Sequence, residues 1–288
     1  MSTSLTLHHG DLRCELKPEL GGCIAGLWLG DVPVLRSTPA ADLHSVRQSA
    51  SYPLVPFSNR IGNATLQWQG TDHPLIKNWA PDAHSIHGVG WERAWGVLDA
   101  TDTFALLSYE HKADPAWPFD FDASQAFKLD TDALEMSLSI TNQSAVSAPV
   151  GLGWHPYFVK RANSRLVFAA TGRWDMGADK LPTHRGPSTG VDADATTLEV
   201  DHCFDGWNGA ARLFDDVLRT TITSSLSRLV VYTTPARDTV AVEPVSHVNN
   251  AMNMVAQIGV SAEKLGVCIL QPGQTFSCDM RITVERVG

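Results

Sequence analysis

The feature that most constrains the fold of this chain is the recurrence of short segments rich in β-branched and aromatic residues, each bounded by turn-forming residues. Residues 133–142 show the pattern most clearly, because apolar and polar side chains alternate there. The apolar positions are Leu134, Met136, Leu138 and Ile140. A period of two places one face of a strand against a core and the other toward water. The segment therefore predicts a half-buried strand of an antiparallel sheet.

Similar segments recur along the whole chain, and almost nothing competes with them as a helix. The predicted strands are residues 5–7, 23–29, 64–69, 104–111, 121–129, 134–141, 165–170, 229–233, 240–243 and 275–284. Between two of them, Asp130, Thr131 and Asp132 predict a hairpin turn, because Asp and Thr side chains hydrogen-bond to their own backbone. Many antiparallel strands without helical crossovers predict an all-β fold, with sheets packed face to face or closed on themselves.

The chain carries no Pro-, Ser- or Gly-rich linker and no internal repeat. Its length of 288 residues suits one large β domain. Residues 172–197 are the richest in turn formers, and we interpret them as a loop excursion from this domain. The prediction is a single domain over residues 1–288.

The amino-acid composition indicates which classes of molecule the protein could bind. Hydrophobic residues make up 43% and charged residues 18%, which is typical of a folded globular protein. The formal net charge of -9 disfavours nucleic acid, which is a polyanion, and favours a neutral small molecule. No apolar run approaches the roughly 20 residues that span a bilayer, so no membrane partner is expected.

The cysteines and the N-terminal residues indicate the cellular compartment of the protein. The five cysteines are scattered and include no C-x-x-C pair, so we interpret them as reduced thiols. The first ten residues lack the basic and apolar regions of a secretory signal. Cytoplasm is the default prediction, although a signal already removed would leave the same sequence.

A histidine set among glycines and aromatics is the leading candidate for chemistry. His155 lies in residues 151–158, whose sequence is GLGWHPYF. Imidazole titrates near neutral pH, so a histidine held between aromatic surfaces can give a proton to a sugar ring oxygen. A hydrogen-bonded structural histidine is the alternative interpretation.

Two further segments offer polar groups near glycines. Asn59 and Arg60 precede a Gly, and the guanidinium of Arg60 could hold sugar hydroxyls or a carboxylate, or form a surface ion pair. His84 and His87 form an H-x-x-H pair, but no third ligand lies nearby in the sequence, so no metal site is predicted. The glycines that follow His87 would allow the backbone to approach another group closely.

Two carboxylates end apolar strands later in the chain. Asp201 could accept hydrogen bonds from sugar hydroxyls or cap a turn, and Trp207 nearby could cover sugar C–H groups. Glu243 follows the apolar run 240–242, where burial would raise its pKa and make it a base. The alternative is that Glu243 marks the exit of the strand into solvent.

The sequence lacks the motifs of several common classes of enzyme. The chain has no G-x-S-x-G nucleophile elbow and no cysteine in a catalytic setting. Neither G-x-G-x-x-G nor G-x-x-x-x-G-K-[ST] occurs, so no nucleotide cofactor is expected. Acid–base chemistry without a cofactor remains.

In their order along the chain, these segments resemble the motifs of the aldose 1-epimerase (galactose mutarotase) family, in its less characterised bacterial branch. The matching segments are Asn59-Arg60-Ile61, His87-Gly88, His155-Pro156-Tyr157-Phe158, Asp201-His202-x-Phe204, Val242-Glu243-Pro244 and the closing turn at 270–275. The H-P-Y-F run is the most specific. The sequence departs from better-known members after Phe158, where Val159 and Lys160 follow, and after Glu243, and these differences leave the identity of the sugar open.

The resemblance implies a large antiparallel β-sandwich, the supersandwich, with a monosaccharide in an open cleft and no cofactor. It gives His155 the role of general acid and Glu243 that of general base, and it gives Asn59, Arg60, His87 and Asp201 the binding of the sugar. We expect the imidazole and the carboxylate to face each other across a gap as wide as a pyranose, and a bell-shaped pH profile. The protein would be a monomer or a homodimer.

Two alternatives stay open. A hexose-6-phosphate mutarotase would need basic residues at the rim of the cleft, for which Arg60, Lys160, Arg161 and Arg173 are the candidates. The acidity of the chain disfavours this alternative. The other is a carbohydrate-binding or sensing protein without turnover, which the presence of both proposed catalytic residues disfavours.

Overall fold

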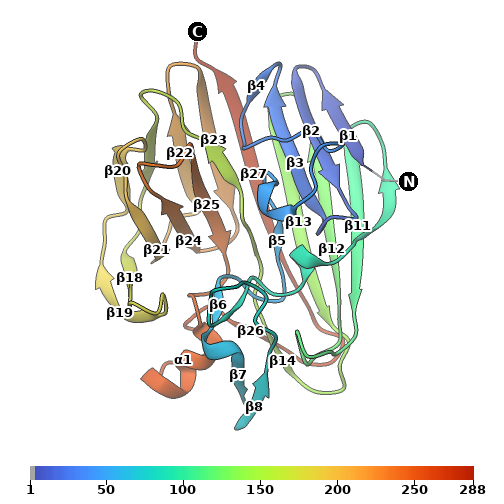
Figure 1. Cartoon of the computed structure of the whole chain (residues 1–288), viewed down its shortest axis with the longest axis vertical. Coiled ribbons are helices and arrows are strands. Elements are labelled where there is room, and N and C mark those ends of the chain that lie inside the picture. The colour runs from blue at the N-terminus through green and yellow to red at the C-terminus, as the bar shows by residue number, and fades with distance from the viewer. Residues whose placement is uncertain (1–3) are drawn as a thin grey trace.

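The structure is a computed structural model that describes residues 4–288, apart from the side chains of residues 256 and 257. Antiparallel strands make up almost all of its regular structure (Figure 1). The all-β prediction is confirmed, and the packing is that of a sandwich. The one α-helix among the described residues, α1 (Ala251–Ile258), was not predicted.

One layer is a nine-stranded sheet, and every neighbouring pair in it is antiparallel. Its order across the sheet is β10 (Gly96–Ala100), β11 (Phe104–His111), β12 (Phe121–Leu129), β13 (Ala133–Asn142), β27 (Thr275–Arg286), β23 (Leu218–Ser224), β22 (Ala210–Phe214), β17 (Arg165–Phe168) and β20 (Val191–Asp194).

Two sheets form the facing layer (Figure 1). The four-stranded sheet contains β1 (Leu5–His9), β2 (Leu12–Lys17), β3 (Cys23–Leu29) and β4 (Val32–Pro33). The eight-stranded sheet has the order β19 (Pro182–Pro187), β18 (Gly172–Met176), β21 (Val200–Asp205), β24 (Arg228–Thr233), β25 (Thr239–Val245), β15 (Gly153–Trp154) and β5 (Pro53–Leu54), with β16 (Tyr157–Val159) also paired to β25.

Short pairs of strands, three 3₁₀ turns and α1 make up the other regular elements of the described residues. The pairs are β14 (Ala148–Val150) with β26 (Cys268–Leu270), β6 (Arg60–Ile61) with β9 (Ser85–Ile86), and β7 (Thr65–Trp68) with β8 (Thr71–Pro74). The 3₁₀ turns are η1 (Val46–Gln48), η2 (Gly62–Ala64) and η3 (Gly90–Glu92).

The turn predicted before β13 is confirmed. The backbone N–H of Asp130 donates to the carbonyl of Ala133 at 2.8 Å, and the N–H of Thr131 donates to the Asp130 carboxylate at 2.8 Å. Strands β12 and β13 pair in the register that this hairpin sets, with Leu129 opposite Leu134.

The prediction of a loop over residues 172–197 is wrong. This segment contains β18, β19 and β20, of which β19 and β20 are edge strands. Edge strands have one unpaired side and lie in water, so their sequences need no apolar alternation. The sequence of β19, PTHRGP, has no fully buried residue.

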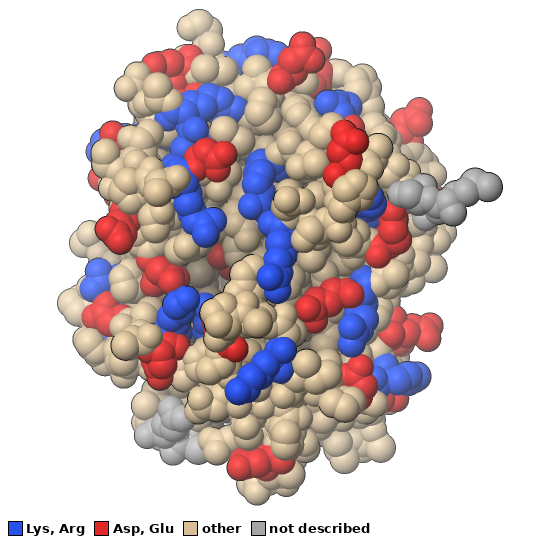
Figure 2. Space-filling model, viewed as in Figure 1, with Lys and Arg blue, Asp and Glu red and all other residues tan. Residues whose placement is uncertain are grey.

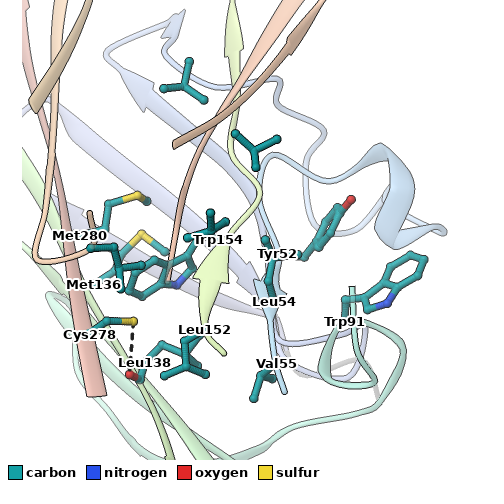
Figure 3. Close-up of a cluster of buried hydrophobic side chains, with 14 of the residues drawn as sticks. Tyr52, Leu54, Val55, Trp91, Met136, Leu138, Leu152, Trp154, Cys278 and Met280 are labelled. Carbon is teal, nitrogen blue, oxygen red and sulfur yellow. Dashed lines mark hydrogen bonds between the residues drawn. The ribbon is translucent and has the colours of Figure 1, made fainter. Parts of the chain in front are cut away.

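The core lies between the two layers. Met136, Leu138, Cys278 and Met280 of the nine-stranded sheet face Leu54, Leu152 and Trp154 of the opposite layer (Figure 3). The alternation predicted for β13 is present, because every second side chain is buried. All five cysteines are free thiols, as predicted. The prediction of a single domain stays a prediction, and its residues 1–3 lie outside the described residues.

Leu138 tests this packing, because its side chain is completely buried in the middle of β13. We expect Leu138→Ala to lower the free energy of unfolding by about 2–5 kcal/mol, through lost transfer energy and the cavity left behind. Ser137→Ala, on the other face of β13, should change it by less than about 0.5 kcal/mol. Denaturant titrations of both variants measure the difference, and equal effects would contradict this assignment of the core face.

Candidate functional site

A pocket of about 480 Å³ contains all six residues predicted to form the site. They are Asn59, Arg60, His87, His155, Asp201 and Glu243. They come from segments that are far apart in the chain, from Asn59 near the start to Glu243 near the end. The pocket has the size and the mixture of aromatic and polar walls that suit a small molecule.

Glu243 lies in the interior of β25 and does not mark an exit into solvent. All seven residues of this strand are buried, and Glu243 itself is 2% exposed. Burial raises the pKa of the Glu243 carboxyl well above its ordinary value, and the charge of Asp201 raises it further. The raised pKa is in the direction expected for a base near neutral pH.

His155 lies in the two-residue connection between β15 and β16. Its backbone N–H donates to the carbonyl of Tyr52 at 3.0 Å, which fixes the main chain beside β5. The imidazole stacks on Tyr157, with ring centroids 4.5 Å apart, and lies 4.8 Å from the ring of Tyr52. The predicted position between aromatic surfaces is therefore observed, and burial lowers the pKa of His155 to about 3.

The imidazole and the carboxylate touch each other directly. Nε2 of His155 lies 3.2 Å from Oε1 of Glu243, so the expectation of a gap as wide as a pyranose is wrong. Burial disfavours the charged form of both groups. Within the described residues, Oε2 of Glu243 and Nδ1 of His155 have no hydrogen-bond partner. Unsatisfied buried polar atoms are rare in folded proteins, and a molecule bound in the pocket could supply the missing partners of these two.

Asn59 and His87 hold each other by two hydrogen bonds. The N–H of His87 donates to the carbonyl of Asn59 at 2.8 Å, and the N–H of Asn59 donates to Nδ1 of His87 at 3.2 Å. The expected close approach of the next glycine is present, because a Cβ on Gly88 would lie 2.2 Å from the carbonyl oxygen of Val55. His87 lies edge-on to His155, with ring centroids 5.1 Å apart.

Arg60 combines both interpretations of its sequence. Its Nε donates to Oδ2 of Asp82 at 3.1 Å, yet its side chain is only 14% exposed and lines the pocket. Asp201 lies near the start of β21, opposite Tyr232 of β24. Its carboxylate caps no turn among the hydrogen bonds of the described residues. The arrangement leaves Asp201 free to accept hydrogen bonds within the pocket.

Two predictions for nearby residues are wrong. Trp207 does not line the pocket, because its side chain is buried and its Nε1 donates to the carbonyl of Ala210 at 2.8 Å. Of the basic residues proposed for a phosphate, only Arg60 lines the pocket. Lys160 binds Thr233 and Thr234, Arg161 pairs with Asp215, and Arg173 pairs with Asp175.

The H-x-x-H pair does not act as a unit. Nδ1 of His84 accepts the N–H of Asn63 at 2.9 Å, and its Nε2 lies 2.8 Å from the carbonyl of Asp179. Both ring nitrogens of His84 are thus used by the backbone. Within residues 4–288, no cluster of three or more His, Cys, Asp or Glu side chains could hold a metal ion.

Most residues in the walls of the pocket were not predicted from the sequence. They comprise Arg36, Arg47, Tyr52, Trp79, Ile86, Trp91, Lys180, Val230, Tyr232 and Arg237. Tyr157, which also lines the pocket, lies in the H-P-Y-F run and could have been nominated from it. The others have no local motif.

Comparisons with known proteins identify the family of this chain. The chain belongs to the aldose 1-epimerase family, because the model of that family matches residues 3–283. It is 35% identical over 219 residues to the uncharacterized protein YphB of Escherichia coli (strain K12), covering 73% of each chain. It is 26% identical over 220 residues to the uncharacterized protein YihR of the same organism, covering 69% of this chain and 70% of that one.

Solved structures show the same fold. A putative aldose 1-epimerase from Escherichia coli K12 has a TM-score of 0.88 and 29% identity, covering 99% of this chain and 100% of the other. A galactose mutarotase-like protein from Clostridium acetobutylicum has a TM-score of 0.86 and 18% identity, covering 99% and 96%. The predicted family and the supersandwich are therefore confirmed. No helix among the described residues is long and apolar enough to span a membrane.

His247 anchors the walls of the pocket as a neutral group. Its Nε2 accepts the backbone N–H of Ser58 at 3.0 Å, so its Nδ1–H must donate to the carbonyl of Val248 at 2.7 Å. A Cβ on Gly151 would lie 1.9 Å from the imidazole, so only Gly fits there. His247 thereby joins the end of β25 to the segments that lead to Asn59 and His155.

Because His247 is buried as a neutral group, we expect the protein to lose stability in acid. Burial lowers the pKa of His247 to about 4, below the value of about 6.5 in an unfolded chain. Between these values the unfolded state binds the extra proton, so the free energy of unfolding falls as the pH falls. We expect His247 to account for a loss of about 2 kcal/mol between pH 7 and pH 5.

The measurement is denaturant unfolding of the wild type and His247→Gln at both pH values. The variant should be less stable at pH 7, and its deficit should shrink at pH 5. His184→Gln, at an exposed histidine, should follow the wild type. A deficit that is the same at both pH values would show that His247 does not titrate as described.

Proposed function

We propose that this protein is a mutarotase that interconverts the α and β anomers of a free aldose by opening and closing the sugar ring. The contact between Nε2 of His155 and Oε1 of Glu243 inside a small-molecule pocket is the observation that supports it most directly. The reaction moves one proton off O1 and another onto O5. Both oxygens are bonded to C1, so the acid and the base must be close neighbours.

In the proposed reaction, the Glu243 carboxylate takes the proton of the O1 hydroxyl and the His155 imidazolium gives a proton to O5. The bond between C1 and O5 breaks, and C1 becomes the carbon of an aldehyde. Rotation about C1–C2 presents the other face of the carbonyl. The O5 hydroxyl then attacks C1 and returns its proton to His155, while Glu243 returns its proton to O1. No proton is gained or lost overall.

The protonation state of the pair fits this cycle. An imidazolium with a carboxylate holds the same number of protons as an imidazole with a carboxylic acid. Burial favours the uncharged form, and the 3.2 Å contact allows the proton to pass between the two groups. The charged form, which performs the reaction, is thus reached without exchange with solvent.

The remaining predicted residues would hold the sugar. Arg60 and Asn59 offer donors, Asp201 offers an acceptor, and His87 lies beside His155. We propose that the protein acts in the cytoplasm, without metal or organic cofactor, as a monomer or homodimer. The alternative of a sugar-binding protein without turnover uses the same pocket, and an assay of anomer exchange separates the two.

His155→Asn and Glu243→Gln test the two catalytic roles. Each should lower kcat by a factor of about one hundred to ten thousand, the usual contribution of a general acid or base. Polarimetry or exchange NMR with glucose and galactose measures the rate. His184→Asn and Glu135→Gln, at residues that do not line the pocket, serve as controls for mutation alone. Wild-type rates in either catalytic variant would refute the roles.

Stability separates a catalytic loss from a folding defect. Glu243→Gln removes an ionisable group from a buried position, so its free energy of unfolding at pH 8 should equal or exceed that of the wild type. An inactive variant that is also strongly destabilised would instead indicate a structural role for this residue.

The pH profile of kcat/KM should be a bell with widely separated limbs. Burial lowers the pKa of His155 to about 3 and raises that of Glu243 well above its ordinary value, so the doubly protonated pair forms only in acid well below pH 6.5 and the fully deprotonated pair only well above the pH at which an ordinary carboxyl ionises. We expect a plateau between these two limits. Circular dichroism at each pH monitors folding. An acid limb centred near pH 6.5 would show that His155 titrates as an exposed imidazole.

A further inference from the structure

Four basic side chains line the pocket without forming an ion pair. They are Arg36, Arg47, Lys180 and Arg237, here called the basic rim. None of them forms an ion pair with an Asp or Glu within residues 4–288. Arg60, the fifth cation of the pocket, is paired with Asp82. The rim therefore presents positive charge to the pocket, although Arg47 also interacts electrostatically with a carboxyl group nearby, that of Glu92.

Arg36 is held in place by neutral groups. Its Nε donates to the backbone carbonyl of Ser49 at 3.0 Å, and its guanidinium lies 3.9 Å above the ring of Tyr157. Tyr157 in turn stacks on His155. These contacts fix the orientation of the cation beside the catalytic pair and leave its charge available to a ligand.

Arg47 and Arg237 are held in the same way. The guanidinium of Arg47 lies 3.0 Å from the ring centre of Trp79, and that of Arg237 lies 4.7 Å from the ring centre of Tyr232. Both aromatic rings line the pocket themselves. Aromatic faces orient a guanidinium without cancelling its charge.

The balance of charge in the pocket is opposite to that of the whole chain. Five cations line it against two carboxyl groups, Asp201 and Glu243, whereas the chain has a formal net charge of -9. The face shown in Figure 2 is hollowed near its centre, and Lys and Arg side chains gather around the hollow. A pocket lined mainly by one sign of charge raises the local concentration of the opposite ion.

Another hollow of the protein provides a contrast. It has a volume of about 610 Å³ and lies on the nine-stranded sheet, with Lys128, Glu135 and Arg281 among its lining residues. There the charges neutralise one another, because Glu135 pairs with both Lys128 and Arg281. Unpaired cations thus distinguish the pocket that contains His155 and Glu243.

We propose that the substrate is an aldose that carries an anionic group, a phosphate or a carboxylate, and that the basic rim binds this group. The inference rests on the proposed mutarotase activity. Because C1 must reach His155 and Glu243, the anion lies on a carbon away from the anomeric centre. A neutral sugar gives four unpaired cations no partner, whereas charge-assisted hydrogen bonds from Arg to an anion are among the strongest that proteins form.

The first experiment compares three sugars with the same ring. Exchange NMR measures the rate of anomer interconversion of glucose, glucose 6-phosphate and glucuronate, after subtraction of the uncatalysed rates. We expect kcat/KM for at least one anionic sugar to exceed that for glucose by about tenfold or more at low ionic strength. The phosphate and carboxylate arms distinguish the two kinds of anion. The advantage should shrink as salt screens the rim.

The second experiment removes cations one at a time. Arg47→Gln and Arg237→Gln should each lower the ratio of kcat/KM for the preferred anionic sugar to that for glucose by about tenfold. Arg212→Gln is the matched control, because Arg212 is an exposed arginine of β22 outside this pocket. Arg36 is left intact, because it binds the backbone at Ser49. An unchanged ratio in both rim variants would overturn the inference.

The outcomes separate this inference from the proposed function. Equal kcat/KM for all three sugars would retain the mutarotase and reject the anionic substrate. Calorimetric titration of the wild type with glucose 6-phosphate and glucuronate measures binding independently of turnover. Tight, salt-sensitive binding without anomer exchange of any sugar would reject the mutarotase and retain an anion-binding sugar site. If the protein neither binds nor turns over any anionic sugar, the inference is overturned.

Discussion

The structure depends on burying an acid and a base in direct contact. Removing either charged group from water is costly, and the cost is avoided when the proton is shared so that neither partner is charged. Strand β25 supplies the buried position of Glu243, and the connection from β15 to β16 supplies that of His155. The β-sandwich holds Glu243 in this position, because β25 is paired with strands on both sides and the carboxylate therefore cannot move into solvent.

The second requirement is that separate segments hold their places around the pair. His247 joins the segment at Ser58 to the end of β25, and the Tyr52 carbonyl holds the main chain at His155. These bonds are made by backbone groups to buried partners. They position the pocket more rigidly than contacts between exposed side chains would, because buried hydrogen bonds have no competing water. The sequence contains no local signal for them, since each joins residues far apart in the chain.

How much the sequence predicts depends on where each segment lies. The alternation in β13 predicts its buried face correctly, because a central strand packs one face on the core. The same reasoning fails for β19 and β20, because edge strands in water need no such alternation. Residues with distinctive chemistry next to glycine or proline, such as His155 and Glu243, could be nominated in advance. Arg36 and Arg237 could not, because only tertiary packing brings them together.

Net charge illustrates the same limit. In the sequence, an overall charge of -9 argues against an anionic sugar. Electrostatic interactions between exposed charges fade over about 8 Å at physiological ionic strength, so distant carboxylates contribute little to the potential inside a pocket. What a ligand meets is the local set of groups, and here that set is mainly basic. The acidity of a chain therefore governs its behaviour toward large polyanions, while the charge of its small-molecule ligand is decided by a few side chains that the fold brings together.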